Sequence, residues 1–176
     1  MPHWIPLTPI SASSFSGWIS SYNASGLSET DYPPKNAVAY ANACQVIVSS
    51  SLQRSIDSAK ALNAEKLALS DKQFIEAGLP SANWKFLKVS PNTWAVIFRF
   101  LWLLGYSNNS ESLKEAKQRA ILATDKLIQL AEKHHKVLFV GHGIFNQLLV
   151  KELKKRGWSG SKKLGSAYWA FKVYAK

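Results

Sequence analysis

Two short apolar runs, each followed at once by an amphipathic segment, constrain the fold of this chain more than any other feature. The runs are CQVIVSS and KVLFV, and each has the length and composition of a buried strand. The apolar residues that share one face of the following helices are Leu52, Ile56, Ala59 and Leu62, and Phe145, Leu148, Leu149 and Leu153. Strands that alternate with helices form a mostly parallel sheet covered on both faces. We therefore expect an α/β fold of three layers, αβα.

Two further helices are indicated by periodicity and by start and stop signals. Apolar residues at positions 15, 18, 19 and 22 fall on one face of a helix that Gly26 would end. Ser90 and Pro91 suit the N-cap and the first helical position of a second helix, which would end near Gly105. The passage DYPPKN between residues 31 and 36 is expected to be extended or turning.

The last third of the chain is organised in the same way. Ser112 and Glu115 have the spacing of a capping box and would start a long helix. Gly157 would close the helix that follows KVLFV, and AYWAFKVYA alternates well enough to predict a final strand near an edge of the sheet. With no internal repeat and no composition shift, residues 1–176 are expected to form a single domain.

The charge and the cysteine content bound the partners and the compartment. A net charge of +11 favours anionic partners. The main basic concentration, residues 151–163, is interpreted as a solvated helix end, and no nucleic-acid-binding motif accompanies it. A single cysteine, Cys44, excludes an internal disulfide and fits a reducing cytosol, so we expect a cytoplasmic protein.

The most hydrophobic window, residues 94–106, bears on membrane association. It is too short to span a bilayer and has Arg99 in its middle, so a buried helix is expected and stable membrane insertion is not. An interfacial helix is the alternative, because tryptophans and positive charge suit a membrane surface. The first ten residues, MPHWIPLTPI, lack the basic start and apolar run of a signal peptide.

Polar residues follow both predicted strands at their carboxyl ends. Ser50 and Arg54 lie where the first strand passes into its helix, and His142 stands between two glycines where the second does so. In parallel sheets ligands gather at this edge. Free backbone N–H groups at a helix start attract anions, and a guanidinium offers a fork suited to phosphate oxygens. These residues favour a phosphate-binding site with Arg54, His142 and Ser50. The alternatives are a surface side chain for Arg54 and a histidine satisfied by a backbone carbonyl for His142.

Glu76 lies between the two strand ends in the sequence, within KQFIEAGLP. It follows an apolar pair and precedes a turn. A partly buried glutamate beside a phosphate site can donate a proton to a leaving alcohol. The four histidines do not form a ligand set, and His134 and His135 are interpreted as a polar helix end, so neither a metal nor a cofactor is expected.

The segments SSSLQRSIDSAKAL, FIEAGLP and VLFVGHGIFNQLL, in this order and at these separations, resemble the histidine phosphatase superfamily, the phosphoglycerate-mutase-like fold. The resemblance runs from about residue 7 to the end of the chain. It implies a two-step mechanism, in which a histidine of an Arg-His-Gly motif attacks phosphorus and water then releases phosphate. It also implies that Arg54 and His142 bind the phosphoryl group and that Glu76 protonates the leaving oxygen, which makes Glu76 and His142 the catalytic residues of this chain. A covalent intermediate divides the displacement, and cationic donors stabilise its charge.

The sequence contains no Arg-His-Gly, and the apolar strand that would deliver it is also missing. His3 follows Pro2, has no strand before it and no glycine after it, so it does not fit the nucleophile. In the family that first strand lies inside the sheet. Its loss would leave unpaired backbone groups in its neighbours, each costing about 1–3 kcal/mol.

Two interpretations follow from the missing motif. The first is a shortened form, for example from a start codon placed too far downstream, of a phosphomonoester hydrolase that uses a phosphohistidine. The second is a non-catalytic relative that keeps the pocket for binding phosphate or phosphoproteins. We favour the first for the gene lineage and expect this 176-residue chain to be inactive or feeble. The substrate is expected to be a small-molecule or protein phosphomonoester, with hydrolysis favoured over mutase activity.

Overall fold

The computed structural model describes residues 8–28, 30–160 and 168–176 of the chain. His3 and residues 161–163 of the basic concentration lie outside the described residues. In chain order the elements are β1 (Ile10–Ser11), α1 (Ala12–Ala24), α2 (Lys35–Ala43), β2 (Val46–Ser50), α3 (Gln53–Asn63), η1 (Ala64–Lys66), β3 (Leu67–Asp71), η2 (Lys72–Phe74), β4 (Lys88–Val89), α4 (Pro91–Leu103), α5 (Leu113–His134), β5 (Val137–Val140), α6 (Gly143–Lys155), β6 (Ser159–Gly160) and β7 (Tyr174–Ala175).

The central sheet has three parallel strands in the order β3-β2-β5. Val46 of β2 is in register with Val137 of β5, and the pairing continues to Ser49 and Val140. Helical crossovers connect β2 to β5, which allows the two strands to run parallel. Their carboxyl ends therefore lie at the same edge of the sheet. The prediction of a mostly parallel α/β fold is confirmed.

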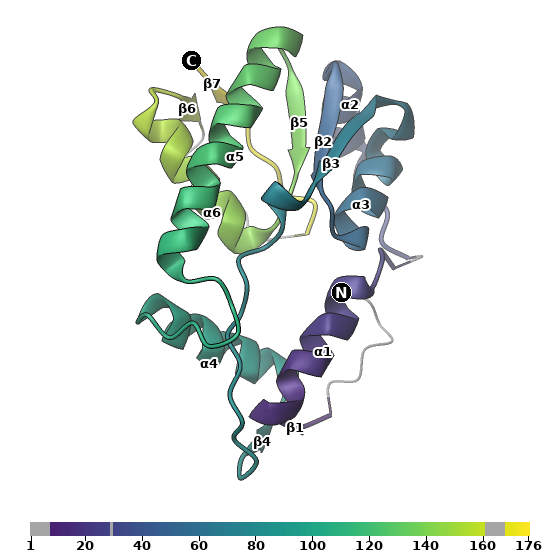
Figure 1. Ribbon diagram of the computed structural model, residues 1–176. Helices are drawn as coiled ribbons and strands as arrows, with labels where there is room; N and C mark the ends of the chain where they lie inside the picture. Colours follow the sequence, from purple (N-terminus) through teal and green to yellow (C-terminus); the bar gives the residue numbers. More distant parts are fainter. Residues whose placement is uncertain (1–7, 29, 161–167) are drawn as a thin grey trace.

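Helices cover both faces of this sheet, with α5 and α6 on one side and α2 and α3 on the other (Figure 1). Successive residues of a strand point to opposite faces. Val48 accordingly belongs to the apolar cluster with α5 and α6, and Ile47 belongs to the cluster with α2 and α3. Both side chains are fully buried, so the core is built around β2.

The predicted helix starts are confirmed in detail. The Ser90 hydroxyl accepts a hydrogen bond from the backbone N–H of Thr93, with Pro91 in the first turn of α4. Ser112 and Glu115 form a reciprocal capping box at the start of α5. Such caps satisfy backbone donors that a helix leaves without partners, so they are readable from local sequence.

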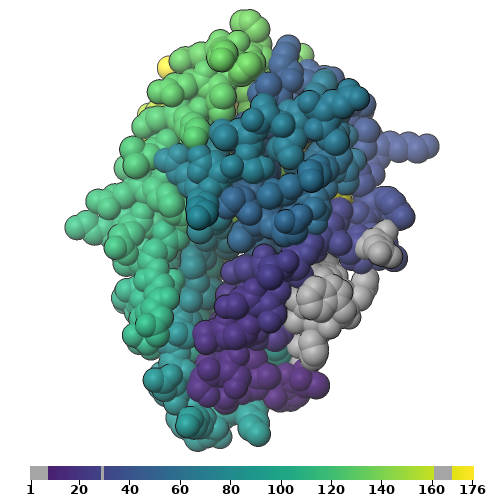
Figure 2. Space-filling view, turned by 45° about the vertical axis from the view of Figure 1, so that its right-hand side comes forward, coloured from purple at the N-terminus to yellow at the C-terminus, as the bar shows by residue number. Residues whose placement is uncertain are grey.

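A third apolar cluster lies below the sheet, where α1 packs against α4 (Figure 1). In the space-filling view α1, in purple, lies between the blue segments of α3 and β3 and the teal segments of α4 (Figure 2). The expectation of a buried helix holds for one face of α4 only. Trp94, Phe98 and Trp102 are buried, whereas the opposite face is exposed and uncharged. The large apolar residues on that face are Val96, Phe100 and Leu103. No helix among the described residues combines the length and the apolar character needed to cross a bilayer.

Two parts of the fold differ from what the sequence pattern predicted. The helix α2 was not expected, because its buried side consists of Ala37 and Ala41, whose small side chains give a weak periodic signal. The final strand over AYWAFKVYA is wrong for most of its length. Within residues 168–176 only Tyr174–Ala175 is a strand, and it pairs with β6 in a separate two-stranded sheet. An alternating pattern alone does not form a strand, because the segment must also lie beside the edge of another strand with which it can pair.

Candidate phosphate-binding site at the carboxyl ends of the strands

His142 and Ser50 meet at the carboxyl ends of β5 and β2. The Nε2 atom of His142 lies 2.7 Å from the Ser50 hydroxyl and 3.1 Å from the hydroxyl of Ser55 in the first turn of α3. All three side chains are buried, and His142 is 8% exposed. The two residues predicted from different strands are therefore brought into direct contact, and the helix starts of α3 and α6 converge on them.

The glycine before His142 is required by packing. A Cβ atom at Gly141 would collide with the Asn146 carboxamide oxygen and with the ring of Phe139. The same Asn146 oxygen accepts a hydrogen bond from the His142 backbone N–H at 3.2 Å. Gly143 meets nothing within 4 Å at the corresponding position. The first glycine thus lets the chain turn tightly from β5 into α6, which fixes the position of the imidazole.

The His142 ring is uncharged at neutral pH. Burial lowers its pKa from 6.5 to about 3, and the positive charges of Arg54 and Arg119 act in the same direction. Removing a cation from water is costly, so a buried imidazole among guanidinium groups keeps its neutral form. An anion placed beside the ring would act against the effects of burial and of the two arginines, and would raise this pKa.

Arg54 faces the end of α1 as well as the site. Its guanidinium donates to the Asn23 side-chain oxygen at 3.2 Å and to the Tyr22 carbonyl at 3.4 Å, and it lies 4.7 Å from the centre of the Tyr22 ring. Burial lowers the pKa of Arg54, with the Tyr22, Glu76 and Tyr168 side chains acting in the opposite direction. The weak hydrogen bonds and the stacking leave guanidinium donors that an anion can use.

Glu76 reaches the start of α6 rather than an open pocket. One of its carboxylate oxygens accepts a hydrogen bond from the Phe145 backbone N–H at 2.8 Å, and the other accepts from Ile144 at 3.2 Å. The first oxygen also accepts from Ala77 at 2.9 Å. A carboxylate at a helix N-terminus satisfies donors that the helix itself cannot. In this structure Glu76 is an acceptor, and its role as proton donor stays a prediction.

Two arginines hold the segment that carries Glu76. Arg119 donates to the carbonyls of Gln73 and Ile75, both at 2.9 Å, while its plane lies over the Phe145 ring at 3.9 Å. Arg99 donates to the carbonyls of Ala77 and Gly78 at 2.7 and 3.3 Å. Arg99, in the middle of the hydrophobic window of residues 94–106, therefore binds backbone carbonyls.

Three residues of this arrangement escaped the sequence analysis. Ser55 directly follows Arg54, and Asn146 lies one helical turn after His142, so both were within quoted segments but carried no signal of their own. Arg119 is far from the site in sequence and is positioned by an ion pair with Glu111. Only the packing of α5 against η2 shows its part in the site.

The arrangement offers an imidazole, two hydroxyls, a guanidinium and two helix starts at one edge of a parallel sheet. These are groups that bind phosphate oxygens. Among the described residues no cluster of three or more His, Cys, Asp or Glu side chains is placed to hold a metal ion. The other described histidines, His134 and His135, lie before β5 and thus at the opposite end of the sheet.

Comparison with known proteins places the chain in a family. The sequence model of the histidine phosphatase superfamily, branch 1, matches residues 36–173. Among curated proteins no sequence matches this chain.

Solved structures of similar fold come from mycobacteria. One is a mycobacterial hydrolase that is 20% identical in sequence. The match covers 80% of this chain and 81% of the hydrolase chain, at a TM-score of 0.50. A mycobacterial glucosyl-3-phosphoglycerate phosphatase in complex with VO3 has 22% identity, with 79% and 76% covered and a TM-score of 0.50. In its native structure that phosphatase, also 22% identical, matches over 68% of this chain, which spans 64% of its length, at a TM-score of 0.48. At these identities the likeness to the first two structures, at a TM-score of 0.50, shows the fold alone.

Proposed function

The chain belongs to the histidine phosphatase superfamily, and we propose that its function is phosphomonoester hydrolysis through a phosphohistidine. The contact of the His142 ring with Ser50 and Ser55 at the carboxyl edge of the sheet carries the proposal. This buried, neutral imidazole stands beside a guanidinium and two helix starts, which together suit a phosphoryl group.

The proposed roles follow from the chemistry of each side chain. Arg54 and His142 bind the oxygens of the phosphoryl group, and Ser50 adds a hydrogen bond. Glu76 donates the proton that the leaving alcohol needs, which requires that it release the α6 backbone N–H groups when substrate binds. Arg119 and Arg99 are positioning residues, because they hold the carbonyls on either side of Glu76.

The nucleophile is the part of this proposal that the described residues do not supply. The sequence has no Arg-His-Gly, and His142 is the only described histidine at the carboxyl edge of the sheet. This observation favours a second candidate function, the binding of phosphate or of phosphoproteins without turnover. For the 176-residue chain alone we propose phosphoryl binding with feeble or no hydrolysis.

The substrate class is a small-molecule or protein phosphomonoester, met in the reducing cytosol that a single cysteine favours. Sugar phosphates are a first class to examine, since a solved structure of similar fold is a glucosyl-3-phosphoglycerate phosphatase. The segment from residue 84 to 109, which includes α4 and several exposed apolar side chains, is the proposed source of selectivity.

Vanadate binding to the full chain tests the site. Titration calorimetry should show binding that falls at least tenfold in Arg54→Ala and in His142→Ala, because each variant removes a group that contacts the anion. A matched control is His135→Asn, which changes an exposed histidine at the other end of the sheet. Its φ of 58° is one that asparagine tolerates. Equal binding in both site variants and the control would show that the site is misassigned.

Turnover separates the two candidate functions. Hydrolysis of p-nitrophenyl phosphate, with an acid-labile phosphohistidine detected by intact mass, would support the hydrolase. Vanadate binding with neither product nor phosphoenzyme would favour the binding function. Loss of turnover in Glu76→Gln with vanadate binding kept would assign Glu76 to proton transfer rather than to anion binding.

A further inference from the structure

Exposed apolar side chains gather at one end of the molecule. The helix α4 and the strand β4 lie at the lower end in Figure 1, with the central sheet above them, and α4 packs against α1 there. Thirteen large apolar side chains are exposed among the described residues, and six of them lie between positions 86 and 104. We call these six the α4 patch: Phe86, Leu87, Val96, Phe100, Leu103 and Leu104. Exposed apolar side chains concentrated in this way mark an interaction surface.

The α4 patch lies in a stretch of chain without acidic residues. Residues 77–110 contain no Asp or Glu, although the chain has 11 of them. The charged residues of this stretch are Lys85, Lys88 and Arg99. The two lysines are exposed and stand directly before and after the first two residues of the α4 patch. Residues 8–28, which include the α1 helix that packs against α4, have no charged residue at all. These two segments therefore combine apolar and cationic side chains and supply no carboxylate.

The one charged side chain of α4 is turned away from the outer face of the helix. The Arg99 guanidinium donates to the carbonyls of Ala77 and Gly78 at 2.7 and 3.3 Å. It also lies 4.8 Å from the centre of the Trp102 ring, which is buried. A solvated helix face normally carries charges, as α5 does with its exposed lysine and glutamate side chains. The outer face of α4 has none, so its pattern is that of a surface covered by a partner.

The charges beside the α4 patch distinguish its possible partners. A two-fold contact between copies of the chain would bring Lys85 and Lys88 of both copies together, and residues 77–110 offer no carboxylate to pair with them. Interfaces between proteins are in general depleted in lysine. Apolar side chains flanked by lysines instead suit the surface of an anionic membrane. With 13 residues α4 is shorter than the roughly 20 that cross a bilayer, so it fits the interface plane.

We propose that the α4 patch binds the surface of an anionic lipid bilayer. The outer face of α4 enters the boundary between headgroups and acyl chains, about 5–10 Å deep. Lys85 and Lys88 contact the anionic headgroups, while Arg99 stays bound to the backbone carbonyls inside the protein. The proposal does not depend on the phosphatase function, because no residue of the α4 patch belongs to the phosphate site.

Co-sedimentation of the full chain with lipid vesicles tests the proposal. Vesicles of one part phosphatidylserine to three parts phosphatidylcholine should bind it, and phosphatidylcholine alone should bind it at least tenfold more weakly. Lys85→Glu combined with Lys88→Glu should weaken binding to the anionic vesicles at least tenfold, because each lysine at the surface contributes about fivefold. The matched control, Lys133→Glu with Lys136→Glu, makes the same change of net charge near the far end of α5. Equal losses in the two double variants would overturn the proposal, since binding would then follow net charge alone.

Two leucine variants test the apolar contact. Leu103→Glu places a carboxylate in the α4 patch and should weaken binding to the anionic vesicles at least tenfold, and Phe100→Glu on the same face repeats the test. The matched control is Leu122→Glu on α5, because Leu122 is 60% exposed and Leu103 is 55% exposed. The control should bind as the unmodified chain does, and circular dichroism should show all three variants folded.

Unchanged binding in both Leu103→Glu and Phe100→Glu would overturn the assignment to the α4 patch. A dimer that Leu103→Glu dissociates, with no binding of the unmodified chain to anionic vesicles, would also overturn it. A second copy of the chain would then be the partner that covers this face.

Discussion

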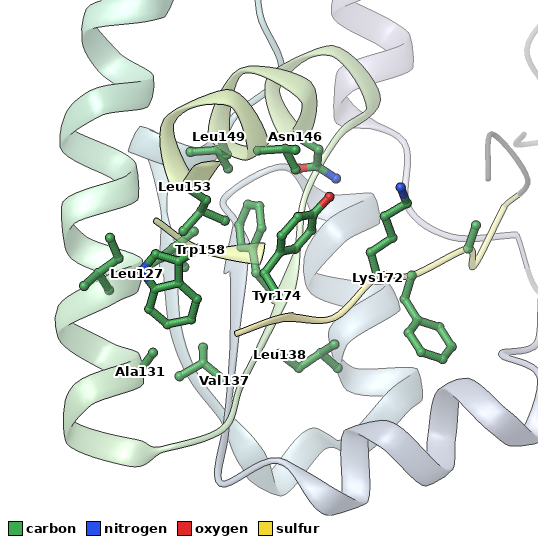
Figure 3. Close-up of a pocket in the computed structure, with 15 residues that line it drawn as sticks. Leu127, Ala131, Val137, Leu138, Asn146, Leu149, Leu153, Trp158, Lys172 and Tyr174 are labelled. Carbon is green, nitrogen blue, oxygen red and sulfur yellow. The ribbon is translucent and has the colours of Figure 1, made fainter. Parts of the chain in front are cut away.

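The two edges of β5 satisfy their polar groups in opposite ways. The inner edge pairs with β2 over four residues and leads to His142, whose ring contacts two serine hydroxyls. The outer edge faces a cavity of about 230 Å³ (Figure 3), where the described residues supply no strand partner for β5 and the Tyr174 hydroxyl has no hydrogen bond. One strand thus has one paired edge and one edge without a strand partner among the described residues.

This difference shows what an apolar run does and does not specify. VLFV requires apolar cover on both faces of the strand, and α3 and α6 are among the elements that supply it. Backbone hydrogen bonds are independent of side-chain character, so the run does not specify a partner for each edge. The inner edge pairs with β2, and through Ser50 this pairing also builds the proposed phosphate site.

The largest expected effect concerns the inner edge and is acid destabilisation through His142. The ring has a pKa of about 3 in the folded chain and an ordinary value of 6.5. The unfolded chain therefore binds the proton first. The stability from the neutral ring is complete above pH 6.5 and is lost as the pH falls toward 3, in total about 5 kcal/mol at about 1.4 kcal/mol per unit. Urea unfolding at a series of pH values measures it.

His142→Gln provides the control for this pH dependence. Its amide can keep contacts with Ser50 and Ser55 but does not titrate. The unfolding free energy of the variant should fall less steeply between pH 6.5 and 3 than that of the unmodified chain, by up to about 1.4 kcal/mol per pH unit. If the unfolding free energies of the two proteins changed with pH in parallel, the folded site around His142 would not disfavour the charged ring.

The next largest effect compares a residue on each strand. Ile47 of β2 and Leu138 of β5 are register partners in one apolar cluster, but Ile47 is fully buried and Leu138 is half-buried. Ile47→Ala should lower the free energy of unfolding by about 3–4 kcal/mol and Leu138→Ala by about 1–2 kcal/mol. Denaturant titration of both variants measures the contrast. Equal losses would remove the distinction between the two strands.

The smallest effect concerns the outer edge. Tyr174→Phe removes the unpartnered buried hydroxyl and keeps the ring, so the free energy of unfolding should rise by up to about 1 kcal/mol. Urea unfolding measures the change, and a variant less stable than the unmodified chain would show that the hydroxyl is already satisfied.

Local sequence was sufficient where the signal and its cause lie within a few residues. The cap at Ser90 and the capping box of Ser112 and Glu115 are of this kind, because neighbouring backbone groups are the partners. The position of His142 at a strand end was likewise readable from VLFVGHG. Sequence reasoning failed for α2, where alanines form the buried side, and for the final strand, whose pairing depends on an edge supplied by another part of the fold.

By itself the sequence determined the α/β class, the parallel strands and the edge at which Ser50, Arg54 and His142 gather. These follow from hydrophobic periodicity and from the rule that parallel strands end together. Only the tertiary structure decided that Glu76 caps α6, that Arg119 holds its segment, and that one edge of β5 has no strand partner among the described residues. The physical reason is that hydrogen-bond partners and buried neighbours belong to the packed chain, in which residues distant in sequence become adjacent.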